Sequence, residues 1–103
     1  MKKKKEVRQK FREKVFERDN HLCKMCSNVK DLDAHHITDR NEMPNGGYVK
    51  ENGITLCSSC HLKAELWHTS GKETHHPGYH PNDLYKIITS SYDIAYKSSQ
   101  ELL

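Results

Sequence analysis

Four cysteines form two Cys-x-x-Cys pairs, Cys23 with Cys26 and Cys57 with Cys60, and 30 residues lie between the pairs. Each pair presents two thiolates from one tight turn, and two such turns complete the tetrahedron of ligands that zinc prefers. Disulfides or a thioredoxin-like redox motif are the alternatives, but a redox motif does not account for two copies. We therefore predict one structural zinc ion. Four thiolates leave no coordination position open, so any catalysis must use other residues.

Three of the eight histidines could do chemistry: His35 and His36 are adjacent, and His61 directly follows Cys60. Neighbouring side chains of a regular strand point to opposite faces, so the pair is expected at a strand end or bend. Two imidazoles could bind a divalent metal, and a third could act as a base, since its ordinary pKa lies near neutrality. His21 and the histidines of "HHPGYH" are expected in exposed loops.

A strand, loop, strand and helix in succession are predicted to position these residues. "LDAHHI" and "GITLC" are short β-type runs, and residues 38–52 between them are rich in Gly, Pro and Asn. The helix of "SSCHLKAELWHTSG" is predicted to have Ser58 as its N-cap and to stop at Gly71. The resulting unit is a compact ββα motif.

Helices are predicted on both sides of this unit, which makes the fold class α+β. In residues 6–18 the apolar side chains recur at helical spacing: Val7, Phe11, Val15 and Phe16. Residues 83–103 place another apolar stripe on one C-terminal helix: Leu84, Ile88, Tyr92 and Ala95. One domain over residues 1–103 is expected, with a basic arm and helix (1–18), a zinc-stapled ββα core (19–70), and a loop and C-terminal helix (71–103).

Composition agrees with a small stapled domain. Hydrophobic residues make up 34% of the chain, charged residues 30%, and mean hydropathy is −0.96, so a core of this size needs the zinc as a staple. Residues 1–18 carry nine Lys or Arg against three Glu. Such a basic segment suits a polyanion, although a solvated lysine tail explains the charge equally well. Without an apolar run long enough for a membrane span or a secretory signal, a cytoplasmic protein is expected.

The pattern "RD…C-x-x-C…DAHHI…GG…ENGITLC-x-x-CH", over about residues 12–66, resembles the HNH endonucleases of the ββα-metal (His-Me finger) superfamily. More narrowly it resembles the small zinc-knuckle HNH proteins common in phage genomes and in restriction and homing systems. The resemblance implies a bacterial or phage-infected host cell. It also implies that His35 and His61 are ligands of a catalytic metal, that His36 is the general base, and that Asn52 braces the base and its loop. A further ligand position of some relatives corresponds to Glu65.

The same resemblance implies hydrolysis of DNA phosphodiester bonds to 5′-phosphate and 3′-hydroxyl ends. The catalytic ion would be Mg²⁺, or Mn²⁺, Ni²⁺ or Zn²⁺ in a site with two imidazole ligands. Salt-sensitive contact with the DNA backbone is expected from the basic arm: Lys2, Lys3, Lys4, Lys5, Arg8 and Arg12.

Three other interpretations compete with a nuclease. A non-catalytic zinc-binding DNA module would need none of His35, His36, Asn52 and His61. A zinc deaminase would require His-x-Glu and Pro-Cys-x-x-Cys motifs, whereas Leu56 precedes the second knuckle here. A zinc-stapled adaptor stays open, since the stripe of the C-terminal helix could dock a protein partner or a second subunit.

Overall fold

The computed structural model describes residues 4–102 and has an α+β architecture, as predicted. Helix α1 (Lys4–Arg18) precedes strand β1 (Leu32–His36), and strand β2 (Gly53–Cys57) runs directly into helix α2 (Ser58–Thr69). Helices α3 (Pro81–Ile87) and α4 (Tyr92–Gln100) complete the chain. The connection between the strands makes three short 3-10 turns: Arg40–Glu42, Pro44–Gly47 and Lys50–Asn52. None of the helices within residues 4–102 is long and apolar enough to cross a membrane.

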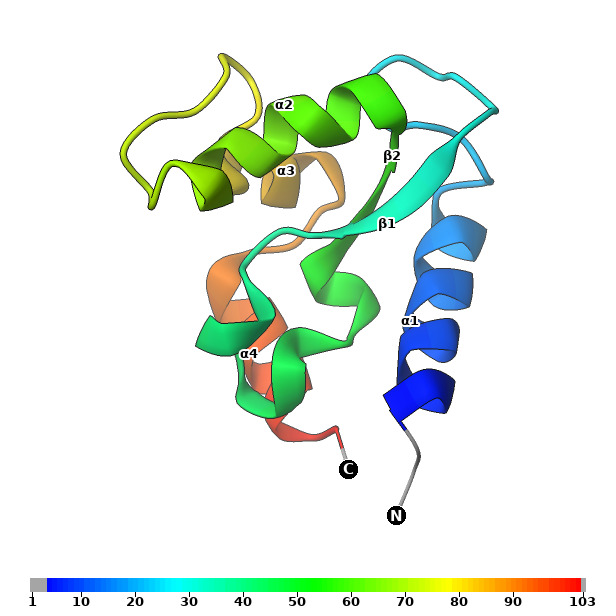
Figure 1. Ribbon diagram of the computed structural model, residues 1–103. Coiled ribbons are helices and arrows are strands. Elements are labelled where there is room, and N and C mark those ends of the chain that lie inside the picture. The colour runs from blue at the N-terminus through cyan, green and yellow to red at the C-terminus, as the bar shows by residue number, and fades with distance from the viewer. Residues whose placement is uncertain (1–3, 103) are drawn as a thin grey trace.

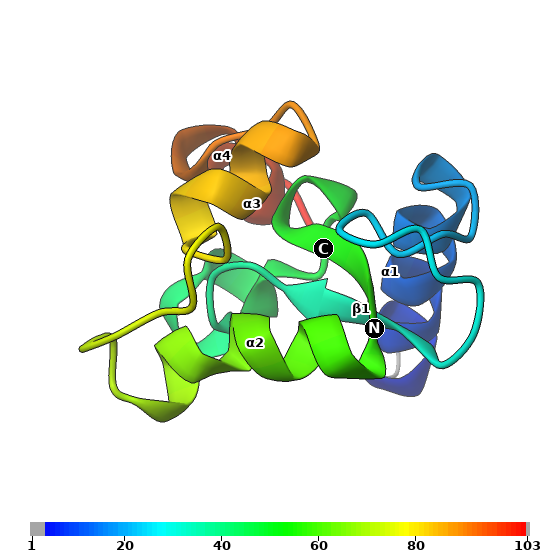
Figure 2. The same ribbon diagram turned by 90° about the horizontal axis from the view of Figure 1, so that it is seen from above.

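The two strands form an antiparallel sheet whose faces are covered by different helices (Figures 1 and 2). In the register His35 lies opposite Ile54, and His36 lies opposite Gly53. Ile54 and its face of β2 belong to the buried core shared with α2 and α3. Gly53 lies under α1, where an added Cβ would come within 2.5 Å of Val15. Alternation along the strands therefore sends His35 toward α2 and His36 toward α1.

Helix α1 is anchored by buried apolar residues and by a partly buried ion pair. Phe11 and Val15 are buried, as the helical spacing predicts. At the end of the helix, Arg18 donates two hydrogen bonds of 2.8 Å to the Asp19 carboxylate. Asp19 is itself buried and accepts the backbone N–H of Thr55 at 2.9 Å. These contacts fix the basic helix against the centre of β2.

The prediction of a single C-terminal helix is wrong, because the chain breaks between Ile87 and Tyr92 into α3 and α4. Thr89 has a left-handed backbone (φ 57°), which no α-helix contains. Ser91 then caps α4 by accepting the N–H of Ile94. The predicted cap of α2 is also displaced by one residue. The N-cap is Cys57, which is also the last residue of β2 and makes no capping hydrogen bond with its side chain.

The apolar stripe that could have docked a partner is largely used inside the molecule. Leu84 and Ala95 are buried in the core, and Ile88 packs against it, which leaves Tyr92 as the exposed member of the stripe. Most of the predicted stripe is therefore not available to a partner, and a partner or second subunit docked on the C-terminal helix stays a prediction.

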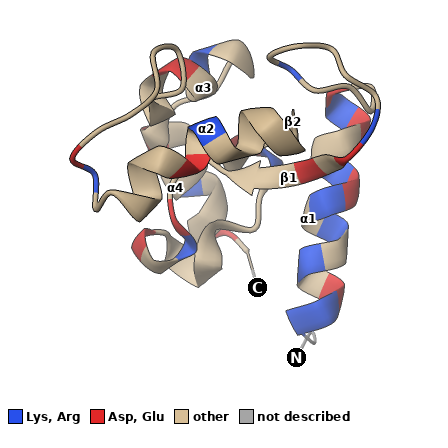
Figure 3. Cartoon of the chain, turned by 45° about the horizontal axis from the view of Figure 1, so that its top comes forward, with Lys and Arg blue, Asp and Glu red and all other residues tan. Residues whose placement is uncertain are grey.

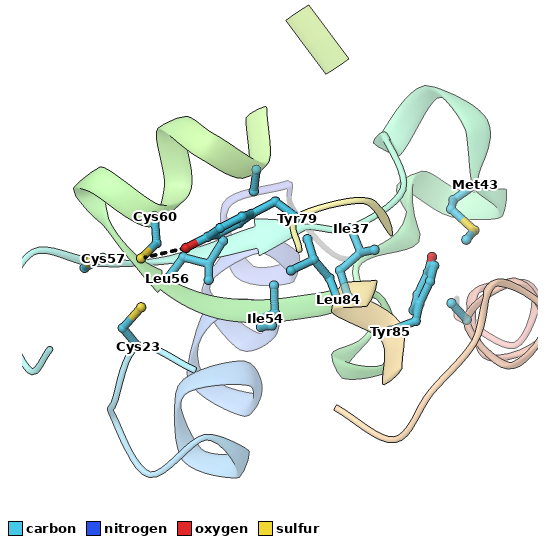
Figure 4. Packing of buried hydrophobic residues seen from close by; sticks show 12 residues of the cluster. Cys23, Ile37, Met43, Ile54, Leu56, Cys57, Cys60, Tyr79, Leu84 and Tyr85 are labelled. Atoms are coloured by element: carbon cyan, nitrogen blue, oxygen red, sulfur yellow. Dashed lines mark hydrogen bonds between the residues drawn. The ribbon is translucent and has the colours of Figure 1, made fainter. Parts of the chain in front are cut away.

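The core lies between β2, α2 and α3 and reaches the cysteines at one end (Figure 4). Ile54, Leu56 and Leu84 form its centre and are almost inaccessible to solvent. Tyr79 is buried beside them and donates its hydroxyl to Cys60 Sγ at 3.4 Å. Hydrophobic packing and the cysteine cluster thus form one continuous unit beneath α2.

Candidate active site and metal centres

The four cysteines converge, as their spacing predicts. Their sulfur atoms all lie within 4.8 Å of one another, and none forms a disulfide. Zn–S bonds of about 2.3 Å place the sulfurs of a tetrahedral zinc about 3.8 Å apart, so this cluster fits that ion. The first knuckle is closed by the Ser27 N–H, which donates to the Cys23 carbonyl at 2.8 Å while Ser27 adopts a positive φ of 65°. The second knuckle is the junction of β2 and α2.

A second cluster of ligand-type residues joins β1 to α2. His35, His61 and Glu65 each present one atom within 4.8 Å of the others. Glu65 Oε1 lies 3.2 Å from His35 Nδ1 and 3.1 Å from a ring nitrogen of His61. His61 and Glu65 are four residues apart on one helix face. Asp33, from the start of β1, reaches within 3.6 Å of the other ring nitrogen of His61.

This cluster has the character of a metal site. His35 is buried, and its Nδ1 makes no hydrogen bond with good geometry although it faces the Glu65 carboxylate. Burial lowers the pKa of His35, so its imidazole is neutral and offers a lone pair. Contacts with His35 and His61 hold the pKa of Glu65 well below its usual range. Two imidazole nitrogens and one carboxylate oxygen suit a divalent transition metal or Mg²⁺ and leave coordination positions open.

His36 ends β1 and points to the other face of the sheet. Its ring stacks on Phe11 of α1, with centroids 4.4 Å apart, and meets the edge of Tyr48 at 4.9 Å. Burial, followed by the nearby His35 and Arg40, lowers the pKa of His36 to about 4. Its Nε2 is buried without a hydrogen-bond partner, which leaves Nδ1 as the nitrogen open to solvent. His36 is therefore a neutral, rigidly held imidazole.

An open cleft of about 290 Å³ brings the two faces together at the end of the strand. Its walls include His36 on one side and His61 with Glu65 on the other. Asp39 and Arg40, from the turn after β1, also line it. The pair His35 and His36 thus points to opposite faces: His36 lines the cleft, whereas His35 is buried behind it and contacts the lining residue Glu65.

Asn52 makes no hydrogen bond to the candidate site histidines but holds the chain beside them. It is fully buried. Its amide donates to the carbonyls of Thr38 (3.0 Å) and Gly47 (3.2 Å). Its Oδ1 accepts the Thr38 N–H at 3.0 Å and the Tyr85 hydroxyl at 2.7 Å. Its backbone carbonyl accepts the N–H of Ile37, the residue after His36.

His68 is a residue of the cleft that the sequence analysis missed. It lines the cleft, and a ring nitrogen lies 3.3 Å from the carbonyl oxygen of His36. The signal was present in the sequence, because His68 follows His61 by seven residues and Glu65 by three, which places all three on one face of α2. His75 and His76 lie exposed in the loop, as expected, whereas His80 is partly buried as the N-cap of α3.

The residues predicted to contact DNA are only partly free to do so. Lys and Arg are distributed along α1 (Figure 3), which includes Lys4, Lys5 and Arg8 as exposed residues. Arg12 instead pairs with Asp33 at 2.7 Å. Lys2 and Lys3 lie outside the described residues.

An antiparallel strand pair, the helix that follows it and a ligand cluster between them make this a ββα-metal unit. Residues 23–65 match the family model described as HNH endonuclease. This part of the chain is therefore an HNH domain, and the resemblance noted in the sequence is confirmed. No curated protein and no solved structure matches the chain.

Proposed function

We propose that this protein is a metal-dependent endonuclease that hydrolyses phosphodiester bonds in DNA. The observation that carries the proposal is the cluster of His35, His61 and Glu65, two of whose members, His61 and Glu65, line one open cleft together with His36. A zinc-binding module without catalysis would have no use for a second ligand cluster or for an unpartnered imidazole next to it. The HNH domain over residues 23–65 supports a nuclease in general.

In the proposed reaction, His36 is the general base. Its Nδ1 takes a proton from a water molecule whose oxygen attacks the phosphorus of the scissile group. The bond between phosphorus and the 3′ oxygen breaks, and that oxygen takes up a proton from solvent, which yields 5′-phosphate and 3′-hydroxyl ends. Positioned general bases typically contribute about 10²–10⁴ in rate. Phe11 and Tyr48 hold the base in place from below.

His35, His61 and Glu65 would hold the catalytic ion, Mg²⁺ or one of Mn²⁺, Ni²⁺ and Zn²⁺. A divalent ion bound there supplies charge neutralisation at the scissile phosphate and at the leaving 3′ oxygen. Asn52 would keep the turn after β1 in register, so that His36 and Arg40 face the same phosphate. The four cysteines would bind a separate structural zinc ion.

The test is cleavage of supercoiled plasmid DNA with Mg²⁺ or Mn²⁺. The His36→Ala protein should cleave about 10²–10⁴ times more slowly than the wild type, because the base is removed while both ligand clusters stay intact. His76→Ala is the matched control, since His76 is exposed in a loop away from the cleft, and it should cleave at the wild-type rate. Zinc content, measured on each protein, verifies that the cysteine cluster is unchanged.

A wild type that cleaves no faster than His36→Ala with any of these metals would overturn the proposal. If that protein still bound DNA, the alternative of a non-catalytic zinc-binding DNA module would replace it.

A further inference from the structure

Arg40 lies at the junction of two hollows in the surface. One is the cleft that holds the candidate active site, and the other is a groove of about 440 Å³ that also has Arg40 in its wall. The groove runs between the first turns of α1 and the loop that follows β1. Lys4 and Arg8 line it from the helix, and Tyr48 lines it from the loop. The groove and the cleft therefore meet at Arg40.

The groove is positively charged. Its remaining lining residues are Val7, Asn41, Asn45 and Gly46, so the described wall contains three cations and no carboxylate. Arg40 donates a long hydrogen bond of 3.5 Å to the hydroxyl of Tyr48. Partial burial favours the neutral phenol, but the guanidinium groups of Arg40 and Arg8 outweigh it and lower the pKa of Tyr48. Arg8, Arg40 and Tyr48 all line this groove.

The other cations of α1 are placed differently. Arg12 is held by the carboxylate of Asp33 and by the carbonyl of Leu32. Arg18 is held by Asp19. Lys10 is exposed and lies about 200° around the helix from Arg8, away from the groove. The basic helix is therefore divided into residues that complete the fold, residues that face solvent, and the two that enter the groove.

We propose that this groove holds the sugar–phosphate backbone of the DNA strand next to the scissile phosphate. Arg40 contacts the phosphate nearest the cleft, and Arg8 and Lys4 contact the phosphates beyond it. The inference rests on the proposed function for the position of the scissile phosphate. Guanidinium groups pair with phosphate oxygens through two parallel hydrogen bonds, which explains arginine at the positions closest to the cleft. Contacts of this kind position the DNA without reading its sequence.

The experiment measures binding of a short fluorescent DNA duplex by anisotropy, at salt concentrations from about 50 to 200 mM. The full zinc-loaded chain carries His36→Ala in every sample, so that the duplex is not cut. Each phosphate contact that is lost should reduce the slope of log K against log salt by about 0.9. Arg8→Ala and Arg40→Ala should each show that reduction, and the double variant about twice that amount. Arg8→Lys should keep most of the slope.

Lys10→Ala is the matched control, because it removes the same charge from the same helix outside the groove. Its slope should stay close to that of the parent protein. The inference is overturned if Arg8→Ala and Arg40→Ala change the slope no more than Lys10→Ala does. That conclusion would hold even if the cleavage assay showed that plasmid cleavage depends on His36. Failure of the nuclease proposal is detected separately by the cleavage assay. Circular dichroism of each variant verifies that the helices are retained.

Discussion

At the scale of single residues, Asn52 is a buried amide that organises the turn beside the candidate active site. All four hydrogen-bonding positions of its side chain are used, and its partners come from the turn after β1, from Gly47 and from α3. Gly47 is tied to this arrangement, since an added Cβ would come within 2.7 Å of the Asn52 amide nitrogen. The connection between the two strands is thereby fixed around the Asn52 side chain.

Replacing Asn52 by Ala should lower the free energy of unfolding by on the order of 3 kcal/mol, because buried partners such as the Thr38 N–H lose their acceptor. Tyr85→Phe removes one of these hydrogen bonds and should cost about 1 kcal/mol. Urea denaturation followed by circular dichroism measures both. Asn41→Ala is the control, since Asn41 is exposed, and it should change stability by less than about 0.5 kcal/mol. Equal effects of Asn52→Ala and Asn41→Ala would contradict the bracing role.

At the scale of elements, helix α2 supplies most of the side chains of the candidate active site. It begins at the residue after Cys57, so the second zinc knuckle determines where its first turn lies. His61, Glu65 and His68 then share the face that looks toward β1. Helix α1 covers the opposite face of the sheet and supplies Phe11 beneath His36. The two helices therefore hold the candidate metal ligands and His36 from opposite sides of the sheet.

A serine caps helix α4 after the break that separates it from α3. Ser91→Ala should lower the free energy of unfolding by about 1 kcal/mol, because the N–H of Ile94 loses its acceptor. Ser58→Ala should have a smaller effect, since Ser58 is the first residue of α2 and caps nothing. Thermal or urea unfolding of the two variants under the same conditions makes the comparison. A larger loss for Ser58→Ala would show that the sequence-based placement of the cap was right after all.

At the scale of the whole molecule, the cysteine cluster holds together segments that are distant in the chain. One knuckle follows α1, and the other joins β2 to α2. The hydrophobic core adjoins the cluster directly through Tyr79 and Leu56. With only a small apolar core, the fold is expected to depend on the ion.

Removing zinc with a chelator under reducing conditions should therefore unfold most of the chain. Structural zinc sites contribute on the order of 10 kcal/mol to folding, which is comparable to the whole stability of a small domain. Loss of helical circular dichroism should accompany zinc release, and returning zinc should restore the signal. A chelated, zinc-free protein that kept its full helical signal would contradict a structural role for the ion.

Much of this architecture was predictable because it depends on local patterns. A Cys-x-x-Cys turn presents two thiolates whatever the rest of the chain does, and the two strands and α2 follow from runs of five to twelve residues. The helical spacing of apolar residues in α1 likewise predicted that Phe11 and Val15 are buried, because this spacing is also a local pattern. The prediction of a single C-terminal helix failed because an apolar stripe at helical spacing can continue across a break. Only packing reveals the left-handed backbone of Thr89.

The sequence by itself determined which side chains were available for the zinc cluster and for the candidate active site, since residue type and spacing along one element do not depend on packing. Only the tertiary structure decided how the two faces of the sheet meet in one cleft. It placed His36 on Phe11, Tyr85 on Asn52 and Arg12 on Asp33, pairs separated by 21 to 33 residues. Such contacts depend on how whole elements pack, which no short window of sequence contains.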